Sequence, residues 1–122
     1  MPEAAERRKL FVCAEGEVET GTSVVRNFDG LSVGGFNVDG RLYALRNVCP
    51  HRGGALCRGP VTGTTLPTSD FRYVYGREGE IVRCAWHGWE FDITSGRSLV
   101  DPTIRAKTYP IEISEGRVYI VI

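Results

Sequence analysis

Short β-forming runs separated by glycine-containing turns constrain this chain more than any other feature of its sequence. Three such runs, residues 24–28, 31–38 and 41–45, are separated only by Asp29-Gly30 and Asp39-Gly40. Aspartate-glycine is favoured in two-residue turns because both positions take a positive φ, and such turns join antiparallel strands. The sequence therefore predicts consecutive hairpins around these two pairs.

The rest of the chain repeats this pattern. Further pairs of runs flank possible turns at residues 76–79, 94–96 and 115–116. Outside the N-terminus, no window holds a sustained helical period of apolar positions. We therefore expect an all-β fold, a meander of short antiparallel strands. Residues 58–70, with two prolines, two glycines and four threonines, are predicted to form an exposed loop.

Composition limits the class of protein. The 122 residues fit a single domain, 1–122, with a polar N-terminal lead-in at residues 1–8. Fifteen basic residues balance fifteen acidic ones, so the basic excess of a nucleic-acid binder is absent. No apolar run approaches the roughly 18 residues that span a bilayer, and no export signal follows Arg7-Arg8. We therefore expect no nucleic-acid or membrane partner, a cytoplasmic location, and cysteines that bind metal rather than form disulfides.

The chain has only two histidines, and each stands close to a cysteine. Cys49-Pro50-His51 is a C-x-H group, and Cys84-Ala85-Trp86-His87 is a C-x2-H group. Thiolates and imidazoles bind zinc, iron and copper, so the two groups can supply four metal bonds. One interpretation is a 2Fe–2S cluster with both thiolates on one iron, and the other is a Cys2His2 zinc site. Zinc fingers usually pair like ligands, so the mixed groups favour a cluster of iron and sulfide. A zinc site remains the alternative.

Two sequence boxes carry a family resemblance. CPHRGGAL at residues 49–56 and CAWHGWEFD at residues 84–92 resemble the cluster-binding boxes of Rieske 2Fe–2S proteins, as do the turn at 94–96 and residues 109–120. The resemblance implies stacked antiparallel sheets, with one 2Fe–2S cluster in a small subdomain at about residues 46–104. It implies four ligands, Cys49, His51, Cys84 and His87.

Six neighbours of these ligands are expected to surround the cluster: Arg52, Gly53, Gly54, Trp86, Gly88 and Trp89. The glycines permit a close backbone approach, with N–H groups directed at the sulfur atoms. The two tryptophans are expected mainly to pack in the core of the subdomain. Two further cysteines, Cys13 and Cys57, are expected to be small buried residues.

The kind of Rieske protein follows from what the boxes lack. High-potential members add one cysteine to each box and join the two by a disulfide, but the matching positions here are Gly54 and Trp86. They also place hydroxyl groups near the cluster, where this chain has Trp89 and Phe91. The resemblance therefore implies a potential at the low end of the Rieske range, as in the ferredoxins of ring-hydroxylating systems.

The expected function is one-electron transfer from a reductase to a terminal oxygenase. No histidine is left to hold the mononuclear iron of a catalytic subunit, so the chain is expected to be no enzyme and to have no small-molecule substrate of its own. One alternative is a small non-catalytic Rieske subunit of a larger oxidoreductase such as nitrite reductase. Another is a zinc-stapled binding module. The linker between His51 and Cys84, residues 52–83, is longer than is usual in family ferredoxins.

Overall fold

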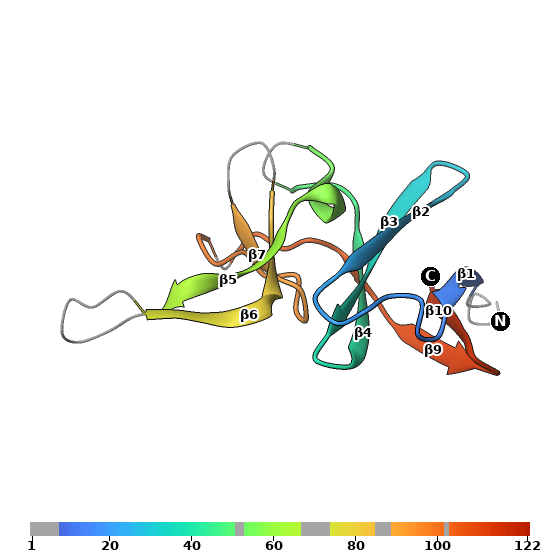
Figure 1. The fold of residues 1–122 in the computed structure, drawn as a ribbon. Coiled ribbons are helices and arrows are strands. Elements are labelled where there is room, and N and C mark those ends of the chain that lie inside the picture. The colour runs from blue at the N-terminus through green and yellow to red at the C-terminus, as the bar shows by residue number, and fades with distance from the viewer. Residues whose placement is uncertain (1–7, 51–52, 67–73, 85–88, 102) are drawn as a thin grey trace, which may run out of the picture.

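The computed structural model describes residues 8–50, 53–66, 74–84, 89–101 and 103–122, which form three antiparallel sheets (Figure 1). The terminal sheet contains, in spatial order, β1 (Lys9–Ala14), β10 (Arg117–Val121) and β9 (Ile111–Ser114). The central sheet contains β2 (Ser23–Phe28), β3 (Leu31–Val38), β4 (Arg41–Arg46) and β8 (Thr108–Tyr109). The third sheet contains β5 (Val61–Leu66), β6 (Val74–Arg83) and β7 (Glu90–Asp92). The predicted all-β fold is confirmed, and the described residues add only one 3-10 turn, η1 (Leu56–Arg58).

The predicted hairpins at the acidic-glycine pairs are confirmed. Both turn residues have positive φ at Asp29-Gly30 (48° and 93°), Asp39-Gly40 (53° and 90°) and Glu115-Gly116 (51° and 75°). Two positive φ values in succession define the type I′ turn, whose twist matches that of the flanking strands. These turns join β2 to β3, β3 to β4 and β9 to β10, so local sequence sets the register of much of two sheets.

The predicted loop at residues 58–70 is wrong over residues 61–66, which form β5. This strand pairs with β6 in antiparallel register, from Val61↔Val82 to Leu66↔Val74. The segment is rich in β-branched residues, which favour extended backbone. Its proline and glycine neighbours mark the ends of the strand rather than a loop, and residues 67–70 lie outside the described part.

The predicted hairpin around residues 76–79 is also wrong. Residues on both sides of this turn pair with the same strand, β5, so β6 passes through it without reversing. Residues 77–80 leave the ladder opposite Gly63, as a bulge in β6. Arg77 and Gly79 have positive φ values of 56° and 82°, so the backbone does turn locally. The sequence identified the turn residues, but a bulge uses the same residues as a hairpin.

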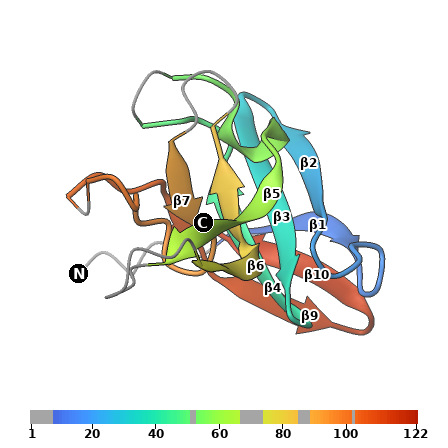
Figure 2. The ribbon, with the colours of Figure 1, turned by 60° about the vertical axis from the view of Figure 1, so that its left-hand side comes forward.

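The central sheet is buried on both faces, which makes the molecule three-layered (Figures 1 and 2). The core against the terminal sheet contains Val12, Cys13, Val18, Val33, Ala44, Val118 and Ile120. The core against the third sheet contains Phe36, Val38, Leu45, Cys49, Leu56, Cys57, Val82, Cys84, Phe91, Ile93 and Ala106. Successive strand residues face opposite sides, so Ala44 and Leu45 of β4 enter different cores. The stacked sheets implied by the family resemblance are therefore confirmed.

The two ends of the described chain lie side by side. β1 pairs with β10, and the Ile122 N–H donates to the Arg8 carbonyl at 2.9 Å. Of the expected lead-in at residues 1–8, only Arg8 is within the described part. In the same part of the chain, no helix is long and apolar enough to cross a membrane.

Candidate metal centre

Cys49 and Cys84 lie in the same core. Cys49 follows β4 and Cys84 follows β6 directly, and each residue is only 1% exposed. Both thiols pack in the core between the central and third sheets, and neither is in a disulfide. The fold therefore brings together two cysteines that are far apart in the sequence, each at the end of a strand.

The two cysteines begin loops that close in the same way. The Cys49 N–H donates to the Gly54 carbonyl at 2.6 Å, and the Cys84 N–H donates to the Trp89 carbonyl at 2.8 Å. Each loop thus returns to its cysteine after five residues. Gly53, with φ at 78°, donates its N–H to the Cys49 carbonyl at 2.7 Å. That N–H was expected to face a sulfur atom, and it instead helps to close the loop.

Part of the predicted site lies outside the described residues. This applies to the expected ligands His51 and His87 and to their neighbours Arg52, Trp86 and Gly88. Of the expected tryptophans, Trp89 is half-buried and packs against the core shared by the two cysteines. Its packing agrees with the structural role expected from the sequence.

Buried contacts around η1 hold the first loop. The Cys57 N–H donates to Asn47 Oδ1 at 2.7 Å, and Asn47 Nδ2 donates to Ser32 Oγ at 3.1 Å. Asn47 is 8% exposed, so its amide satisfies hydrogen-bonding groups that water does not reach. Residues 47 and 57 bracket the loop that contains Cys49. The side chain of Asn47 therefore closes the base of this loop and ties it to the central sheet.

Cys57 is packed against a glycine of the central sheet. A Cβ atom at Gly34 would overlap the side chain of Cys57, so η1 can approach β3 only because residue 34 is glycine. Burial raises the pKa of the Cys57 thiol to about 12, and a hydrogen bond with the Gly34 backbone opposes the rise. The thiol donates to the Leu45 carbonyl at 3.5 Å. The expectation that Cys57 and Cys13 are buried is therefore confirmed, with the two residues 1% and 2% exposed.

A second close approach joins the two loops. The Arg83 N–H donates to the Pro60 carbonyl at 3.0 Å, and a Cβ atom at Gly59 would overlap the Arg83 carbonyl oxygen. Gly59 has φ −73° and ψ 165°, which any residue can adopt. Glycine is therefore required at residue 59 by the lack of room for a Cβ atom and not by the backbone conformation. The segment that follows the first loop lies directly against the residue that precedes Cys84.

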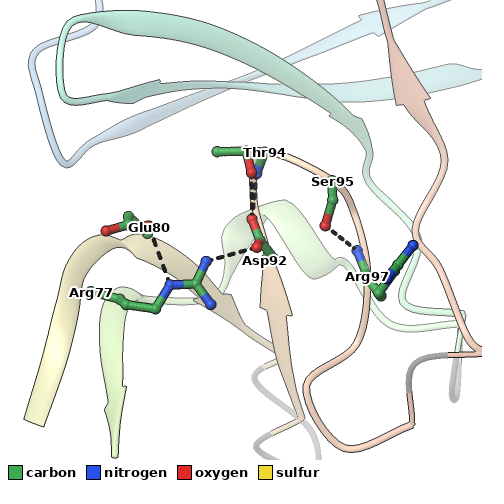
Figure 3. A network of polar contacts seen from close by, with 6 residues as sticks. All are labelled: Arg77, Glu80, Asp92, Thr94, Ser95 and Arg97. Atoms are coloured by element: carbon green, nitrogen blue, oxygen red, sulfur yellow. Dashed lines mark hydrogen bonds and ion pairs between the residues drawn. The ribbon is translucent and has the colours of Figure 1, made fainter. Parts of the chain in front are cut away.

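Strand pairing and polar contacts support the second loop. β6 and β7 flank this loop and pair from Arg83↔Glu90 to Ile81↔Asp92. Arg77 forms ion pairs with Asp92 at 2.7 Å and with Glu80 at 3.2 Å, on the side away from the loop (Figure 3).

The carboxylate of Asp92 is the centre of these contacts. It accepts the Thr94 hydroxyl at 2.7 Å and the Thr94 N–H at 2.9 Å (Figure 3). Burial acts to raise the pKa of Asp92, but the bonds from Thr94 and Arg77 outweigh it, so the pKa lies below its ordinary value. The contacts of Asp92 hold the turn at residues 94–96 in place. This turn is one of the segments that resemble Rieske proteins in sequence.

Three structural residues of the site were not found from the sequence: Gly34, Asn47 and Gly59. A glycine inside a strand pattern signals a bulge or a close backbone approach, so Gly34 carried a usable signal. Asn47 could be read as a turn residue because it follows a strand. Nothing local marks Gly59, because its partner is Arg83 on another strand.

The described donor atoms suit a metal group. Two cysteines that form no disulfide reach one core from two similar loops, and in the sequence a histidine follows each cysteine within three residues. Buried thiols that make no disulfide, with imidazoles nearby, are ligands for iron–sulfur clusters or zinc. The two described thiols therefore fit the thiolate half of the predicted donor set, and the two imidazoles stay a prediction.

Comparisons with known proteins identify the family. The family profile described as the Rieske 2Fe-2S domain matches residues 8–110. The ferredoxin component of a naphthalene 1,2-dioxygenase system from Pseudomonas aeruginosa is 31% identical, over 91% of this chain and 88% of that protein. A solved Sphingomonas yanoikuyae ferredoxin is 30% identical with a TM-score of 0.69, covering 93% of this chain and 97% of that one. A Mycobacterium tuberculosis chain, assigned as the small subunit of an NADH-dependent nitrite reductase, is 26% identical with a TM-score of 0.72, covering 96% of both chains. This chain belongs to the Rieske 2Fe-2S domain family.

Proposed function

We propose that this Rieske protein is a ferredoxin that passes single electrons from a reductase to a terminal oxygenase. The observation that carries the proposal is the pair of buried cysteines that share one core at the start of two equivalently closed loops. The protein is an electron-transfer component of an oxidoreductase system and not itself a catalyst. Ferredoxin components of dioxygenase systems are its relatives over most of its length, which supports this direction of electron flow.

The ligands in this proposal are Cys49, His51, Cys84 and His87, with the two thiolates on one iron and the two imidazoles on the other. The burial of both thiols supports it, because a protein that excludes water from the sulfur ligands protects them from exchange and oxidation. The loop-closing hydrogen bonds hold the two cysteine backbones in fixed positions. When bound, a 2Fe–2S cluster supplies a one-electron couple.

The donor set also sets the potential. Two thiolates and two neutral imidazoles leave an oxidised 2Fe–2S core with no net charge, whereas four thiolates leave it at about −2. Imidazole ligation places Rieske potentials at about −150 to +300 mV, against about −400 mV for four thiolates. Trp89 and the fully buried Phe91 offer no hydroxyl near the loops. We therefore place the potential of this protein near the lower end of the Rieske range.

Metal and sulfide analysis tests the ligand assignment. The purified protein should contain about two irons and two acid-labile sulfides per chain. His87→Cys should lower the potential, on the order of 100 mV, because a thiolate adds negative charge. Cys13→Ala, which changes a buried cysteine of the other core, should leave iron content and potential unchanged. A colourless protein with zinc and no sulfide would establish the zinc-stapled module instead.

Electron delivery tests the role as a ferredoxin. The reduced protein should pass its electron to an oxidised ring-hydroxylating terminal oxygenase, and it should support repeated turnover when the substrate of that oxygenase and dioxygen are present. It should be reduced again by a pyridine-nucleotide-dependent reductase. Failure to exchange electrons with any such oxygenase, from a protein with a full cluster, would contradict this role.

The limits of the subdomain and the location of the protein are parts of the same proposal. Residues 46–104 would form the cluster-binding subdomain of one domain, 1–122, which is supported by the position of η1 and the third sheet within that range. A cytoplasmic location is supported by four cysteines that form no disulfide, a state typical of reducing compartments. Fractionation of the source cells tests the location.

A second candidate is the small subunit of a larger oxidoreductase such as nitrite reductase. The structural match to the nitrite reductase small subunit favours it. The two roles differ in their assembly. A ferredoxin exchanges between partners and purifies alone, whereas a permanent subunit co-purifies with a large catalytic chain in fixed ratio.

A further inference from the structure

We propose that four cations form a docking surface for an acidic face of a partner redox protein. These residues, named here the basic strip, are Arg46, Arg97, Arg105 and Lys107. The redox character of the partner rests on the proposed function. The acidic character of its docking face rests on the strip alone.

The strip is continuous because its members lie on neighbouring segments. β4 pairs with β8 through Leu45↔Thr108, and beyond that pair the Arg46 N–H donates to the Lys107 carbonyl at 2.8 Å. An antiparallel bridge places Arg97 opposite Arg105. Opposed residues of an antiparallel pair project to the same side, so each pair presents two cations together.

The four side chains face solvent. Ser98, beside Arg97, is 2% exposed, and Ala106, between Arg105 and Lys107, is 4% exposed. Side chains alternate along an extended chain, so the buried neighbours direct the cations outward. All four cations are exposed.

Within the described residues, the strip carries charge that no ion pair engages, and the Lys107 ammonium lies 5.9 Å from the centre of the Tyr109 ring. Within the described part of the chain, the ion pairs engage Lys9, Arg26, Arg77 and Arg83, and no member of the strip. Like charges directly opposite each other on paired strands destabilise the fold. The arrangement of Arg97 against Arg105 therefore does nothing for stability, and a carboxylate brought by a partner would relieve it.

The position of the strip links it to the cysteine loops. Arg46 ends β4, three residues before Cys49. Two exposed apolar side chains adjoin the strip in sequence, Val48 at 36% and Val100 at 62% exposure. Apolar side chains next to unpaired charges suit a transient interface, in which charge guides the encounter and a small apolar contact completes it.

The opposite end of β4 is mixed in charge. Arg41, which begins β4, lines a hollow of about 560 Å³ together with Asp39, Glu78 and Glu80, and Glu80 is paired with Arg77. Charge of one sign is therefore gathered at the strip, whereas cations and carboxylates stand together at the far end of β4. Charge of one sign on one surface orients an acidic partner before contact, which raises the rate of productive encounters. A nucleic acid is a weaker explanation because the protein has no basic excess.

The first test measures binding of poly-L-glutamate to the cluster-loaded protein by calorimetry. Arg97→Glu places a carboxylate opposite Arg105, so this variant keeps or raises the melting temperature while the strip loses two units of charge. Its affinity for poly-L-glutamate should fall about tenfold at about 10 mM ionic strength, and binding by the wild type should vanish at about 500 mM. Arg41→Glu makes the same charge change at the other end of β4 and should alter the affinity less than twofold.

The second test measures the electron-transfer rate to two small oxidants in stopped flow. Reduced protein gives one electron to trisoxalatocobaltate(III), an anion, or to hexaamminecobalt(III), a cation, and each cobalt becomes cobalt(II). The ratio of the rate with the anion to the rate with the cation should fall at least fivefold in Arg97→Glu at low salt. In Arg41→Glu the ratio should stay within twofold of the wild type. Salt at about 500 mM should remove the difference between the variants.

Three results would overturn the proposal: equal effects of the two substitutions, no effect of Arg97→Glu, or tighter binding of a single-stranded oligonucleotide than of poly-L-glutamate. Neither test uses an oxygenase or a reductase. A protein that passes both tests but delivers no electrons to oxygenases would therefore contradict the proposed function, while the docking role of the basic strip would remain supported.

Discussion

The two cysteine loops close with the same hydrogen bond but are held by different kinds of interaction. The first loop depends on buried, long-range contacts, in which Asn47 and Cys57 tie its base to the central sheet. The second loop continues a strand pair and is supported by that pairing and by two partly exposed ion pairs, Arg77–Asp92 and Arg83–Glu90. The same local geometry can therefore rest on tertiary packing in one place and on local pairing in another, and the two loops should differ in sensitivity to mutation.

The largest effect is expected where the two loops meet. Gly59→Ala would place a methyl group on the Arg83 carbonyl oxygen, and neither backbone can move without shifting a loop. We expect a loss of about 3 kcal/mol in the free energy of unfolding and a lower cluster content. Urea unfolding and iron analysis provide the measurements.

Gly30→Ala is the control for this substitution. Gly30 has a positive φ but open space around its Cβ position, so only a conformational penalty of about 1 kcal/mol is expected. Cluster content should be normal in this variant. An equal cost for the two substitutions would mean that the close approach of Gly59 to Arg83 does not join the loops.

An intermediate effect is expected at the base of the first loop. Asn47→Ala leaves the buried N–H of Cys57 without its acceptor, which should cost about 1–3 kcal/mol. The effect should be confined to the first loop, and amide hydrogen exchange at Cys57 should accelerate while that of β7 should not. Ser32→Ala removes only the outer bond of Asn47 and should cost about 0.5–1 kcal/mol. Equal acceleration in β7 would show that the two loops are not supported separately.

The smallest effect is expected at the supports of the second loop. The pKa of Asp92 is lowered in the folded protein, so its contacts stabilise the fold above the pKa of the unfolded carboxyl group. That contribution should be lost as the pH falls from about 4 through the folded pKa. Arg77→Gln should cost about 0.5–1 kcal/mol at neutral pH, with the difference from the wild type shrinking in acid.

Lys9→Gln is the matched control for Arg77→Gln, since it breaks an exposed pair with Glu112. Its cost should be smaller, because both of its side chains are about half exposed. Urea unfolding at several pH values measures both variants. An acid-independent cost of Arg77→Gln would place the role of Arg77 in the β6 bulge and not in its ion pair with Asp92.

The sequence predicted the fold well where the signal was local. Asp29-Gly30, Asp39-Gly40 and Glu115-Gly116 each form the expected turn between strands, because two residues suffice to favour that conformation. The predictions for residues 61–66 and 76–79 were wrong. A strand flanked by proline resembles a loop in sequence, and a bulge uses the same turn residues as a hairpin. In both cases only the pairing between β5 and β6 identifies the structure.

The candidate site divides in the same way. The residue types and spacing of the two cysteine-histidine groups determined the chemistry, because metal preference is a property of the ligand atoms themselves. Only the tertiary structure decided that Cys49 and Cys84 share a core, that Cys57 packs closely against Gly34, and that the basic strip is continuous. Turn preference and ligand identity depend on a few neighbouring residues, whereas burial and strand pairing depend on residues far apart in the chain, which no local pattern brings together.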